Sequence, residues 1–482
     1  MIAEKTTQTL RDDLLQTIYS LQDKFLNFEL GEEQVDVLIS IFTFLRKKGF
    51  DELVLSGPGG SGKSAITKLI VLYLEKQYIP YILATPTNKA CGVLHNYTER
   101  DVITLHKLLT LKPSIDIINL DFKDLQWNAD TISSGIPLNG VLIIDECSMI
   151  NSDLYEFIKE RAKIRQCKVI YTGDDKQLYP VKEKELSKPF QCRHQCYLNK
   201  IYRQQEDNPL LDILNTLREH SINQFYEVRS PEGNLVIYHH WRKFISSASH
   251  LFKKSVDLRN PEVVKLLAYT NKRVEAFNQI LRESIFHNEA EYNIGEILMG
   301  YDTCSYKNKQ VFKSMEFEII NSSEYIVTNI VPSHCQLGYI TYKGYYLTLQ
   351  PVNTEYSEDE VFIISRDTPE KDFSALAAYI ELMRLDAIQA RSKAASSKLW
   401  REYFRVMESF TTPVDLIYGN RTVRKKTLDY GYCLSVHKSQ GSNYDNILID
   451  MGNLFTCKNK EELRQLQYVA LSRTRNNISM LI

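Results

Sequence analysis

The run GPGGSGKS at Gly57–Ser64 constrains this chain most, because it matches the phosphate-binding loop pattern G-x-x-x-x-G-K-[ST] at every fixed position. The apolar run Glu52–Ser56 predicts a buried strand before it, and the helical spacing of Ala65–Glu75 predicts a helix after it. In that context backbone N–H groups hold phosphate, Lys63 reaches the β- and γ-phosphates, and Ser64 offers a hydroxyl to Mg²⁺. The alternative is a glycine turn that simply enters a helix. The pattern predicts a nucleoside triphosphate bound at Gly57, Pro58, Gly59, Gly60, Ser61, Gly62, Lys63 and Ser64.

A second segment, Val141–Glu146 (VLIIDE), predicts hydrolysis in addition to binding. Its four apolar residues suit a parallel strand that is buried on both faces, so its carboxylates lie at the edge of the sheet where ligands bind. Asp145 is placed to hold Mg²⁺, and Glu146 is placed to orient or deprotonate the attacking water. The same pattern alone also occurs where a strand enters a turn, but about 80 residues after a phosphate-binding loop it favours a nucleotide site.

The composition narrows the class of protein. The 482 residues carry a formal net charge of −1, so nucleic-acid binding would need a local groove rather than a global basic field. Nine irregularly spaced cysteines indicate reduced thiols. Cys192 and Cys196 could ligate zinc, but a strand edge with buried thiols is favoured because no second pair follows at finger spacing. The absence of an apolar leader or a membrane-length apolar stretch predicts a soluble, cytoplasmic protein.

The order of elements predicts two α/β layers. Residues 1–29 are amphipathic and predicted to be helical, and strands then alternate with helices over residues 30–181, which is typical of a doubly wound sheet. A second layer starts near Cys196–Arg203, includes the strand Val263–Thr270 and resumes at Tyr432–Val436.

Segments with a different sequence pattern interrupt the second layer. Residues 293–366 are short β-rich segments with tight turns, typical of a small antiparallel barrel. Residues 370–410 predict one long charged helix.

The order of short motifs along both layers resembles the superfamily 1B helicases, specifically the RecD-like and phage Dda-like group. The matching segments are LGEEQ ending at Gln34, GPGGSGKS, ATPTNKA at Ala84–Ala90, TLHKLL at Thr104–Leu109, DECSM at Asp145–Met149, GDDKQLYPV at Gly173–Val181, IYRQ at Ile201–Gln204, AYTNKRVEAFN at Ala268–Asn278, SVHKSQG at Ser435–Gly441 and YVALSRTR at Tyr468–Arg475. The resemblance spans residues 30–482, and the combination is specific although several of its motifs are weak alone.

This resemblance implies an α/β fold of two RecA-like domains with doubly wound parallel sheets, a small β-hairpin insert, and an inserted SH3-like β-barrel with a helical arm. The implied divisions are a helical extension at 1–29, a first RecA-like domain at 30–109 and 139–198, a pin hairpin at 110–138, a second RecA-like domain at 199–292 and 411–482, and the SH3-like domain with its arm at 293–410.

The resemblance also implies an activity: an ATP-dependent DNA helicase that moves 5′-to-3′ on single-stranded DNA and unwinds forked duplex DNA. ATP and Mg²⁺ would bind in the cleft between the two RecA-like domains. A monomer is expected to act, with proteins of replication or repair as partners.

Further residues take roles from the matched motifs. Arg203 and Arg473 match the two arginines that stabilise charge on the γ-phosphoryl oxygens, and Gln177 would sense the γ-phosphate. Without the motif order, either arginine would be interpreted as a surface salt bridge. The resemblance assigns three more residues to the nucleotide: Gln34, Gln440 and Gly441.

A single strand is held through its phosphates and base faces. The matched motifs place polar groups along that track at Thr87, Asn88, Lys89, His106, Ser435, His437 and Lys438. Any one of these is more often an ordinary loop residue, so the prediction rests on their joint placement. Tyr179 is a further candidate, as a stacking platform.

Residues 110–140 suit a projecting β-hairpin, where related enzymes carry a pin that splits the duplex. Phe122 is the candidate wedge for strand separation, and the alternative is that it anchors the hairpin to its own layer. The basic stretch Arg421–Lys426 could hold nucleic acid, but a solvated charged loop is favoured.

Two other functions stay open. An RNA helicase of the same superfamily is one, because the predicted track holds mainly phosphates. The other is a nucleic-acid-binding protein in which ATP only switches conformation.

Overall fold

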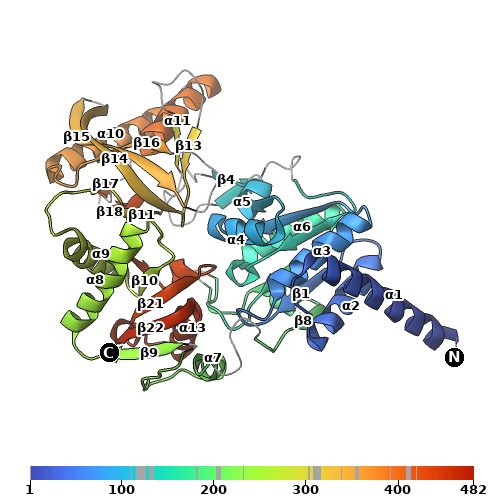
Figure 1. Ribbon diagram of the computed structural model, residues 1–482. Helices are drawn as coiled ribbons and strands as arrows, with labels where there is room; N and C mark the ends of the chain where they lie inside the picture. Colours follow the sequence, from blue (N-terminus) through green and yellow to red (C-terminus); the bar gives the residue numbers. More distant parts are fainter. Residues whose placement is uncertain are drawn as a thin grey trace. The chain divides into compact units, whose positions relative to one another are not determined.

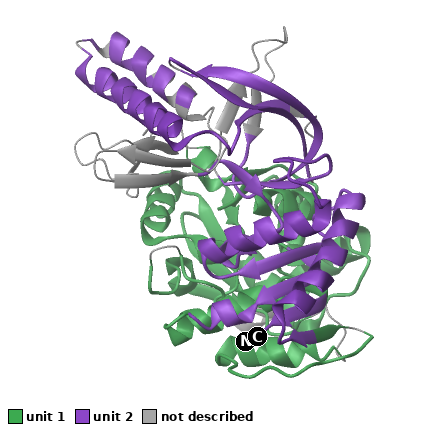
Figure 2. Ribbon diagram, turned by 90° about the vertical axis from the view of Figure 1, so that its left-hand side faces the viewer, with its two compact units in different colours: residues 1–235, 440–442, 457–476 green, residues 236–439, 443–456, 477–482 purple. Residues whose placement is uncertain are grey.

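The computed structural model describes residues 2–109, 111–114, 126–129, 135–180, 183–201, 208–231, 233–301, 304–307, 316–337, 339–352, 358–390, 392–408, 414–418 and 421–482. The chain forms two compact units, coloured separately in Figure 2. Unit 1 contains residues 1–235, 440–442 and 457–476, and unit 2 contains residues 236–439, 443–456 and 477–482. Short segments late in the chain therefore return to unit 1.

Unit 1 is built on a six-stranded sheet of order β3-β2-β6-β7-β1-β8, in which every pairing is parallel. Its strands are β1 (Glu52–Ser56), β2 (Tyr81–Thr85), β3 (Val102–Thr104), β6 (Val141–Ile144), β7 (Lys168–Gly173) and β8 (His194–Tyr197). The parallel α/β arrangement predicted from the sequence is confirmed. So is the placement of β1 and β6 on the two apolar runs.

Successive apolar side chains of the central strands point to opposite faces of the sheet, which explains why helices cover both faces. Leu53 and Leu55 pack into one apolar core with α2 and α3, whereas Val54 between them packs into a second core with α5 and α6. In the same way, Val141 and Ile143 of β6 face the first core, and Leu142 and Ile144 face the second. A strand that is apolar on both sides can only be buried in a sheet of this kind.

The helices of unit 1 are α1 (Ile2–Phe25), α2 (Glu32–Arg46), α3 (Lys63–Lys76), α4 (Asn88–Thr98), α5 (Leu105–Leu108), α6 (Ser152–Ile164), α7 (Leu210–Glu219) and α13 (Lys460–Ser472), with short 3₁₀ turns η1 (Cys147–Met149) and η2 (Lys188–Gln191). The predicted helical extension is α1, whose Leu14, Ile18 and Leu21 are buried in the first core. The strand-edge interpretation of the cysteine pair agrees with β8, an edge strand that contains the half-buried Cys196 and follows the buried Cys192.

The predicted hairpin is represented by β4 (Leu111–Ser114) and β5 (Gln126–Ala129), which pair antiparallel. Phe122 lies outside the described residues, so its role as a wedge stays a prediction.

Unit 2 contains a second α/β layer, visible in Figure 1 as a sheet with α8 and α9 side by side on it. The sheet has the order β20-β10-β21-β22-β9, and β10 pairs in parallel with both of its neighbours. Its elements are β9 (Asn234–Tyr238), α8 (Trp241–Asp257), β10 (Val264–Ala268), α9 (Asn271–Phe286), β20 (Cys433–Ser435), η3 (His437–Ser439), β21 (Tyr444–Asp450), α12 (Met451–Leu454) and β22 (Thr474–Leu481). This parallel layer confirms the second α/β layer. Its predicted start near Cys196–Arg203 is wrong, because Cys196 lies on β8, which pairs with β1 in the first sheet.

An antiparallel module interrupts this layer, as predicted. Its five-stranded sheet has the order β16-β15-β14-β11-β19, with strands β11 (Ile297–Gly300), β14 (Glu324–Leu337), β15 (Ile340–Pro351), β16 (Asp359–Ile364) and β19 (Leu428–Tyr430). Two further antiparallel pairs are β12 (Cys304–Lys307) with β13 (Glu316–Ile319), and β17 (Val414–Tyr418) with β18 (Arg421–Lys425). The basic stretch is thus largely β18, a strand and not the charged loop that the sequence favoured. The SH3-like class of the module stays a prediction, as do the domain boundaries.

The helical arm differs from the single long helix predicted for residues 370–410. It consists of α10 (Glu370–Gln389) and α11 (Lys393–Glu408), which pack on each other. The Ser392 hydroxyl accepts from the Ala395 N–H at 3.2 Å, and this cap starts the second helix. The apolar residues of both helices, including Ile380 and Tyr403, share one cluster with Phe362 of β16, so folding back buries more apolar surface than one straight helix could.

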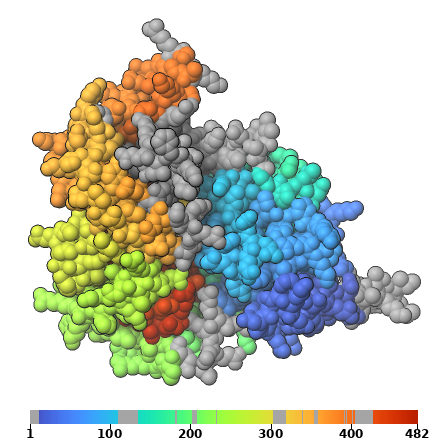
Figure 3. Space-filling model, turned by 45° about the horizontal axis from the view of Figure 1, so that its top comes forward, coloured from blue at the N-terminus to red at the C-terminus, as the bar shows by residue number. Residues whose placement is uncertain are grey.

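Buried ion pairs join the module to the second α/β layer. Lys265 of β10 donates to Glu324 of β14 at 2.6 Å, and the side chains are 0% and 5% exposed. Arg282 of α9 donates to Glu296 at 2.7 Å. In Figure 3, the yellow to orange surface of the module and arm continues into the yellow-green surface of α8 and α9. Among the described residues, no helix combines the length and apolar character needed to cross a membrane.

Candidate functional site

The phosphate-binding loop of unit 1 has the geometry that its glycines demand. Gly62 caps α3 with a φ of 93°, a left-handed conformation, and a Cβ there would lie 2.3 Å from Nε2 of Gln34. A Cβ on Gly57 would lie 2.7 Å from the carbonyl oxygen of Leu198. Lys63 starts the helix, and its ammonium donates to the carbonyl oxygens of Gly57 and Pro58 at 2.8 and 2.9 Å. The loop therefore surrounds a cation at a helix N-terminus, an arrangement suited to phosphate.

Gln34, which the sequence assigned to the nucleotide, lies against this loop. Its Nε2 donates to the carbonyl oxygen of Ser61 at 3.1 Å, and its Oε1 accepts from the Gly31 N–H at 3.0 Å. The side chain is 2% exposed, so both ends of the amide are fixed beside the loop.

The two carboxylates at the end of β6 lie in different surroundings. Asp145 accepts a hydrogen bond from the Thr172 hydroxyl at 2.5 Å, which fixes the carboxylate at the edge of the sheet. Glu146 follows in the left-handed region at φ 56°, a conformation that is uncommon for a residue with a side chain. Burial and the neighbouring Asp145 charge raise the pKa of Glu146 to about 7, although the Arg473 and Lys63 charges oppose the rise. A carboxylate of this pKa can accept a proton from water near neutral pH.

Several buried polar atoms in unit 1 have no hydrogen-bond partner within the described part of the chain. They are Ser61 Oγ, Ser148 Oγ, Gln177 Oε1, Gln440 Nε2 and Ser442 Oγ. Native proteins leave few such groups unpaired, because each costs about 1–3 kcal/mol. All five come from the loop motif, the DECSM and GDDKQ motifs, or the SVHKSQG motif and the residue after it. Their chemistry fits a ligand that is rich in oxygen and carries bound water, as a nucleotide phosphate does.

The donor set also fits Mg²⁺. Ser64 offers a hydroxyl at the start of α3, and Asp145 offers a fixed carboxylate. No group of three or more metal-binding side chains exists among the residues that the structure describes. An Mg²⁺ ion held by one or two protein ligands completes its shell with phosphate and water oxygens.

Arg473 ends α13, which belongs to unit 1 together with the loop. It is 5% exposed, and its guanidinium donates to the carbonyl oxygens of Val469 and Ser442 at 3.1 and 3.3 Å. Its charge lowers the pKa of Glu146, and a Cβ on Gly441 would lie 4.0 Å from Oε1 of Glu146. The structure thus brings Glu146, Gly441 and Arg473 together. Arg203 lies outside the described residues.

A buried polar triangle, which the sequence did not reveal, holds α13 in place. Tyr468 of α13 donates to Asp174 at 2.6 Å, while Arg218 of α7 donates to Asp174 at 3.0 Å and to the Tyr468 hydroxyl at 2.9 Å. Asp174 and Tyr468 stand in matched motifs, but Arg218 belongs to none. A signal for Arg218 would have required knowing that α7 packs on α13.

The predicted track residues form two groups, one in each unit. In unit 1, Thr87 caps α4 by accepting from the Ala90 N–H, and Asn88 and Lys89 follow in the first turn. Burial lowers the pKa of His106, which favours the neutral imidazole. Tyr179 is half-buried, and burial raises the pKa of its hydroxyl.

In unit 2, the predicted track residues lie at the end of β20 and directly after it. The Ser435 hydroxyl accepts from the Lys438 N–H at 3.3 Å, and the ring of His437 lies 6.3 Å from that of Tyr269. The Lys438 ammonium lies 4.3 Å from the centroid of the Tyr301 ring and donates to Asn321 at 2.7 Å.

Comparisons with known proteins agree with these motifs. A family described as "AAA domain" matches residues 30–234, and one described as "UvrD-like helicase C-terminal domain" matches residues 430–480. The chain is 24% identical to "ATP-dependent DNA helicase dda" of Enterobacteria phage T4, over 93% of this chain and 98% of that protein. It is 23% identical to "Uncharacterized protein R530" of Acanthamoeba polyphaga mimivirus, over 92% and 97%. Among solved structures, Pif1 helicase from Bacteroides in complex with ADP-AlF3 and ssDNA shares 18% identity, covers 94% of this chain and 92% of that chain, and gives a TM-score of 0.49.

Proposed function

This chain belongs to the superfamily 1B helicases, and on that premise we propose that it is an ATP-dependent DNA helicase that moves 5′-to-3′ on single-stranded DNA and unwinds duplex DNA. One observation supports this function most directly. Of the eight buried polar atoms without partners among the described residues, five lie on the motifs around the phosphate-binding loop, and Glu146 and Arg473 lie with them in one unit.

Each residue of the site has a role in hydrolysis. Lys63 exchanges its carbonyl contacts for the β- and γ-phosphates, and Glu146 accepts a proton from the attacking water. Arg473 stabilises the charge that grows on the phosphoryl oxygens, and the unpaired amide of Gln177 senses the γ-phosphate. Arg203 is proposed for a role like that of Arg473, from its motif alone.

Mg²⁺ is proposed as the cofactor that accompanies ATP. When bound, it neutralises phosphate charge and orients the phosphoryl group. Ser64 and Asp145 are the groups of this chain that would hold it, and Thr172 keeps the Asp145 carboxylate in position.

A single copy is proposed to suffice for activity, because Lys63, Glu146 and Arg473 all lie in unit 1 of the chain. A reducing cytoplasmic location is proposed as well. The eight cysteines whose surroundings are described are all free thiols.

The test uses forked duplexes with only a 5′ tail or only a 3′ tail, built from DNA or from RNA. We expect ATP-dependent unwinding of the DNA fork with the 5′ tail. Unwinding of RNA forks alone would replace the proposal with an RNA helicase. If single strands stimulate ATP turnover but no fork is unwound, the remaining interpretation is a nucleic-acid-binding protein in which ATP only switches conformation.

Lys63→Ala is the matched loss-of-function control for these assays. Loss of the β/γ-phosphate contact should abolish both stimulated ATP hydrolysis and unwinding. Unwinding that persists in this variant would show that a contaminating enzyme carries the activity.

A further inference from the structure

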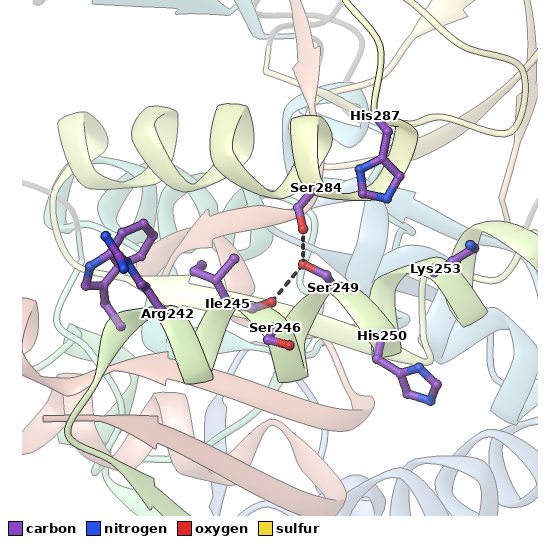
Figure 4. Close-up of a pocket in the computed structure, with 9 residues that line it drawn as sticks. Arg242, Ile245, Ser246, Ser249, His250, Lys253, Ser284 and His287 are labelled. Atoms are coloured by element: carbon purple, nitrogen blue, oxygen red, sulfur yellow. Dashed lines mark hydrogen bonds between the residues drawn. The ribbon is translucent and has the colours of Figure 1, made fainter.

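A surface groove between α8 and α9 in unit 2 lies apart from every motif used above. Its volume is about 530 Å³, and it runs along one face of α8 (Figure 4). Residues of α8 that line it are Trp241, Arg242, Ile245, Ser246, Ser249, His250 and Lys253. Ser284 and His287, from the end of α9, face them across the groove.

The charges of the groove have one sign. Arg242 and Lys253 are exposed and make no ion pair or hydrogen bond within the described part of the chain. No carboxylate lines the groove. The nearest acidic side chain of α9 along the sequence, Glu283, accepts a hydrogen bond from Gln279 and stays outside the lining. In a chain whose net charge is −1, this is a local cationic surface without internal compensation.

Hydroxyl groups form the middle of the groove. Ser249 Oγ and Ser284 Oγ lie 2.6 Å apart, and Ser249 Oγ donates to the carbonyl oxygen of Ile245 at 2.7 Å (Figure 4). These short contacts join the two helices, so the groove has a fixed, neutral and polar floor.

An aromatic surface stands at one end of the groove. Trp241 is 52% exposed, although indole rings are usually more buried. From Arg242 to Lys253 the helix rises by about 16 Å, the length of roughly five nucleotides at the rise of a stacked strand. Cations near both ends, hydroxyls between them and an open indole are the elements from which single-strand sites are built.

The direction of α8 connects the groove with the predicted track. Only residues 258–263 separate the end of α8 from the start of β10, so the Lys253 end lies toward the amino edge of that strand. The Trp241 end of α8 therefore lies toward the carboxyl end of β10. Because β20 is parallel to β10, Ser435 and η3 lie at that same edge.

We propose that this groove is a second nucleic-acid contact, in which Arg242 and Lys253 bind phosphates of a single strand and Trp241 stacks on one of its bases. The proposal rests on the proposed function, because it extends the track that begins at Ser435. An acidic peptide could engage the same cations, but a base gains more from the exposed indole face.

The test compares two double variants of α8. Arg242→Gln with Lys253→Gln removes the two cations that line the groove. Lys243→Gln with Lys254→Gln removes two cations from exposed positions of the same helix that do not line it, so both variants change the net charge equally. Binding is measured by titrating labelled DNA strands of about 8 and about 40 nucleotides at several salt concentrations, since the shorter strand fills only one site.

For the long strand, the groove variant should bind about fivefold or more weakly than the wild type. Its plot of log K against log salt should be flatter by about 1.4, because two phosphate contacts are lost. The control variant should stay near the wild type, and the short strand should bind all three proteins alike. Trp241→Ala should weaken long-strand binding about fivefold or more, and Trp241→Phe should restore most of it.

Equal weakening of long-strand binding in both double variants would overturn the proposal, because the overall positive charge of α8, and not the groove, would then attract the DNA. Binding of poly-glutamate that is lost in the groove variant alone, with DNA binding unchanged, would overturn it in favour of an acidic peptide. The wild-type ATPase distinguishes the two levels of inference. If single strands do not stimulate ATP hydrolysis by the wild type, the proposed function fails. If they do, and the two double variants bind DNA equally well, only the proposal for the groove fails.

Discussion

Two carboxylates, one in each unit, share a pKa raised to about 7 and differ in burial, hydrogen bonding and backbone conformation. Glu146 lies at the end of β6 in unit 1, and Glu296 lies just before β11 in unit 2. Burial is the main cause of the rise in both. Glu296 is 0% exposed and accepts from Arg282 Nε at 2.7 Å and from the Asn293 N–H at 2.8 Å. The Glu146 carboxylate has no hydrogen bond to another described group and is only half-buried.

The comparison shows that a raised pKa does not by itself identify a catalytic carboxylate. Glu296 is enclosed by partners that satisfy it, so it serves the junction between the module and the α/β layer. Glu146 has a left-handed backbone, keeps open oxygen atoms and is accompanied by other polar groups that lack partners. The lack of hydrogen-bond partners and the left-handed backbone, rather than the pKa, distinguish Glu146 from Glu296.

Glu146→Gln should have the largest effect on function. Loss of the proton acceptor should lower single-strand-stimulated ATP hydrolysis by about 10²–10⁴-fold, with nucleotide binding retained. Turnover assays beside nucleotide titration would measure both. Hydrolysis near the wild-type rate would remove the distinction between the two carboxylates.

Glu296→Ala should show the opposite pattern. It leaves the Arg282 guanidinium buried without its carboxylate, which should lower the free energy of unfolding by about 3–5 kcal/mol. Denaturant unfolding monitored by circular dichroism gives the loss. ATP turnover per folded molecule should stay near the wild-type value, and a specific loss of turnover would make Glu296 a functional group.

The pH dependence of stability should sharpen the comparison. The folded pKa of Glu146, about 7, exceeds the ordinary carboxyl value of 4.5, so its ionisation opposes folding. Its contribution to stability is fully present below pH 4.5 and is lost as the pH rises through about 7. Glu146→Gln should therefore melt a few degrees above the wild type at pH 8 and level with it near pH 4.5. A melting difference that does not change with pH would show that the carboxyl is not perturbed.

Tyr468→Phe should have the smallest effect. It removes one hydroxyl from the triangle but leaves the Arg218–Asp174 ion pair, so stability should fall by about 1 kcal/mol. Because α13 carries Arg473, kcat should fall severalfold while the KM for ATP changes little. An equal change in kcat for Tyr468→Phe and for Lys460→Ala, an exposed change on the same helix, would assign the loss to general loosening of α13.

Local patterns predicted the parts of the fold that depend on neighbours in sequence. The strand Glu52–Ser56 and the helix after the loop are set by apolar spacing and by glycines, so their positions follow from the sequence alone. The parallel order of both α/β layers follows from alternating strands and helices.

Features that depend on distant residues were not predictable in this way. Lys265 is fully buried because Glu324, far along the chain, pairs with it, and nothing in the strand VVKLLAYT indicates that partner. Arg218 joins the nucleotide unit through Asp174 and Tyr468, which lie on different elements. The break between α10 and α11 depends on apolar contacts with β16 that a charged helical pattern does not contain.

The contacts of Lys63 have a consequence for the working cycle. Its ammonium donates to the carbonyl oxygens of Gly57 and Pro58, so two oxygens of the loop itself hold the cation at the start of α3. A phosphate group that binds there competes with these two carbonyl oxygens for the same ammonium. The affinity of the loop for a nucleotide therefore depends on the cost of breaking these two contacts.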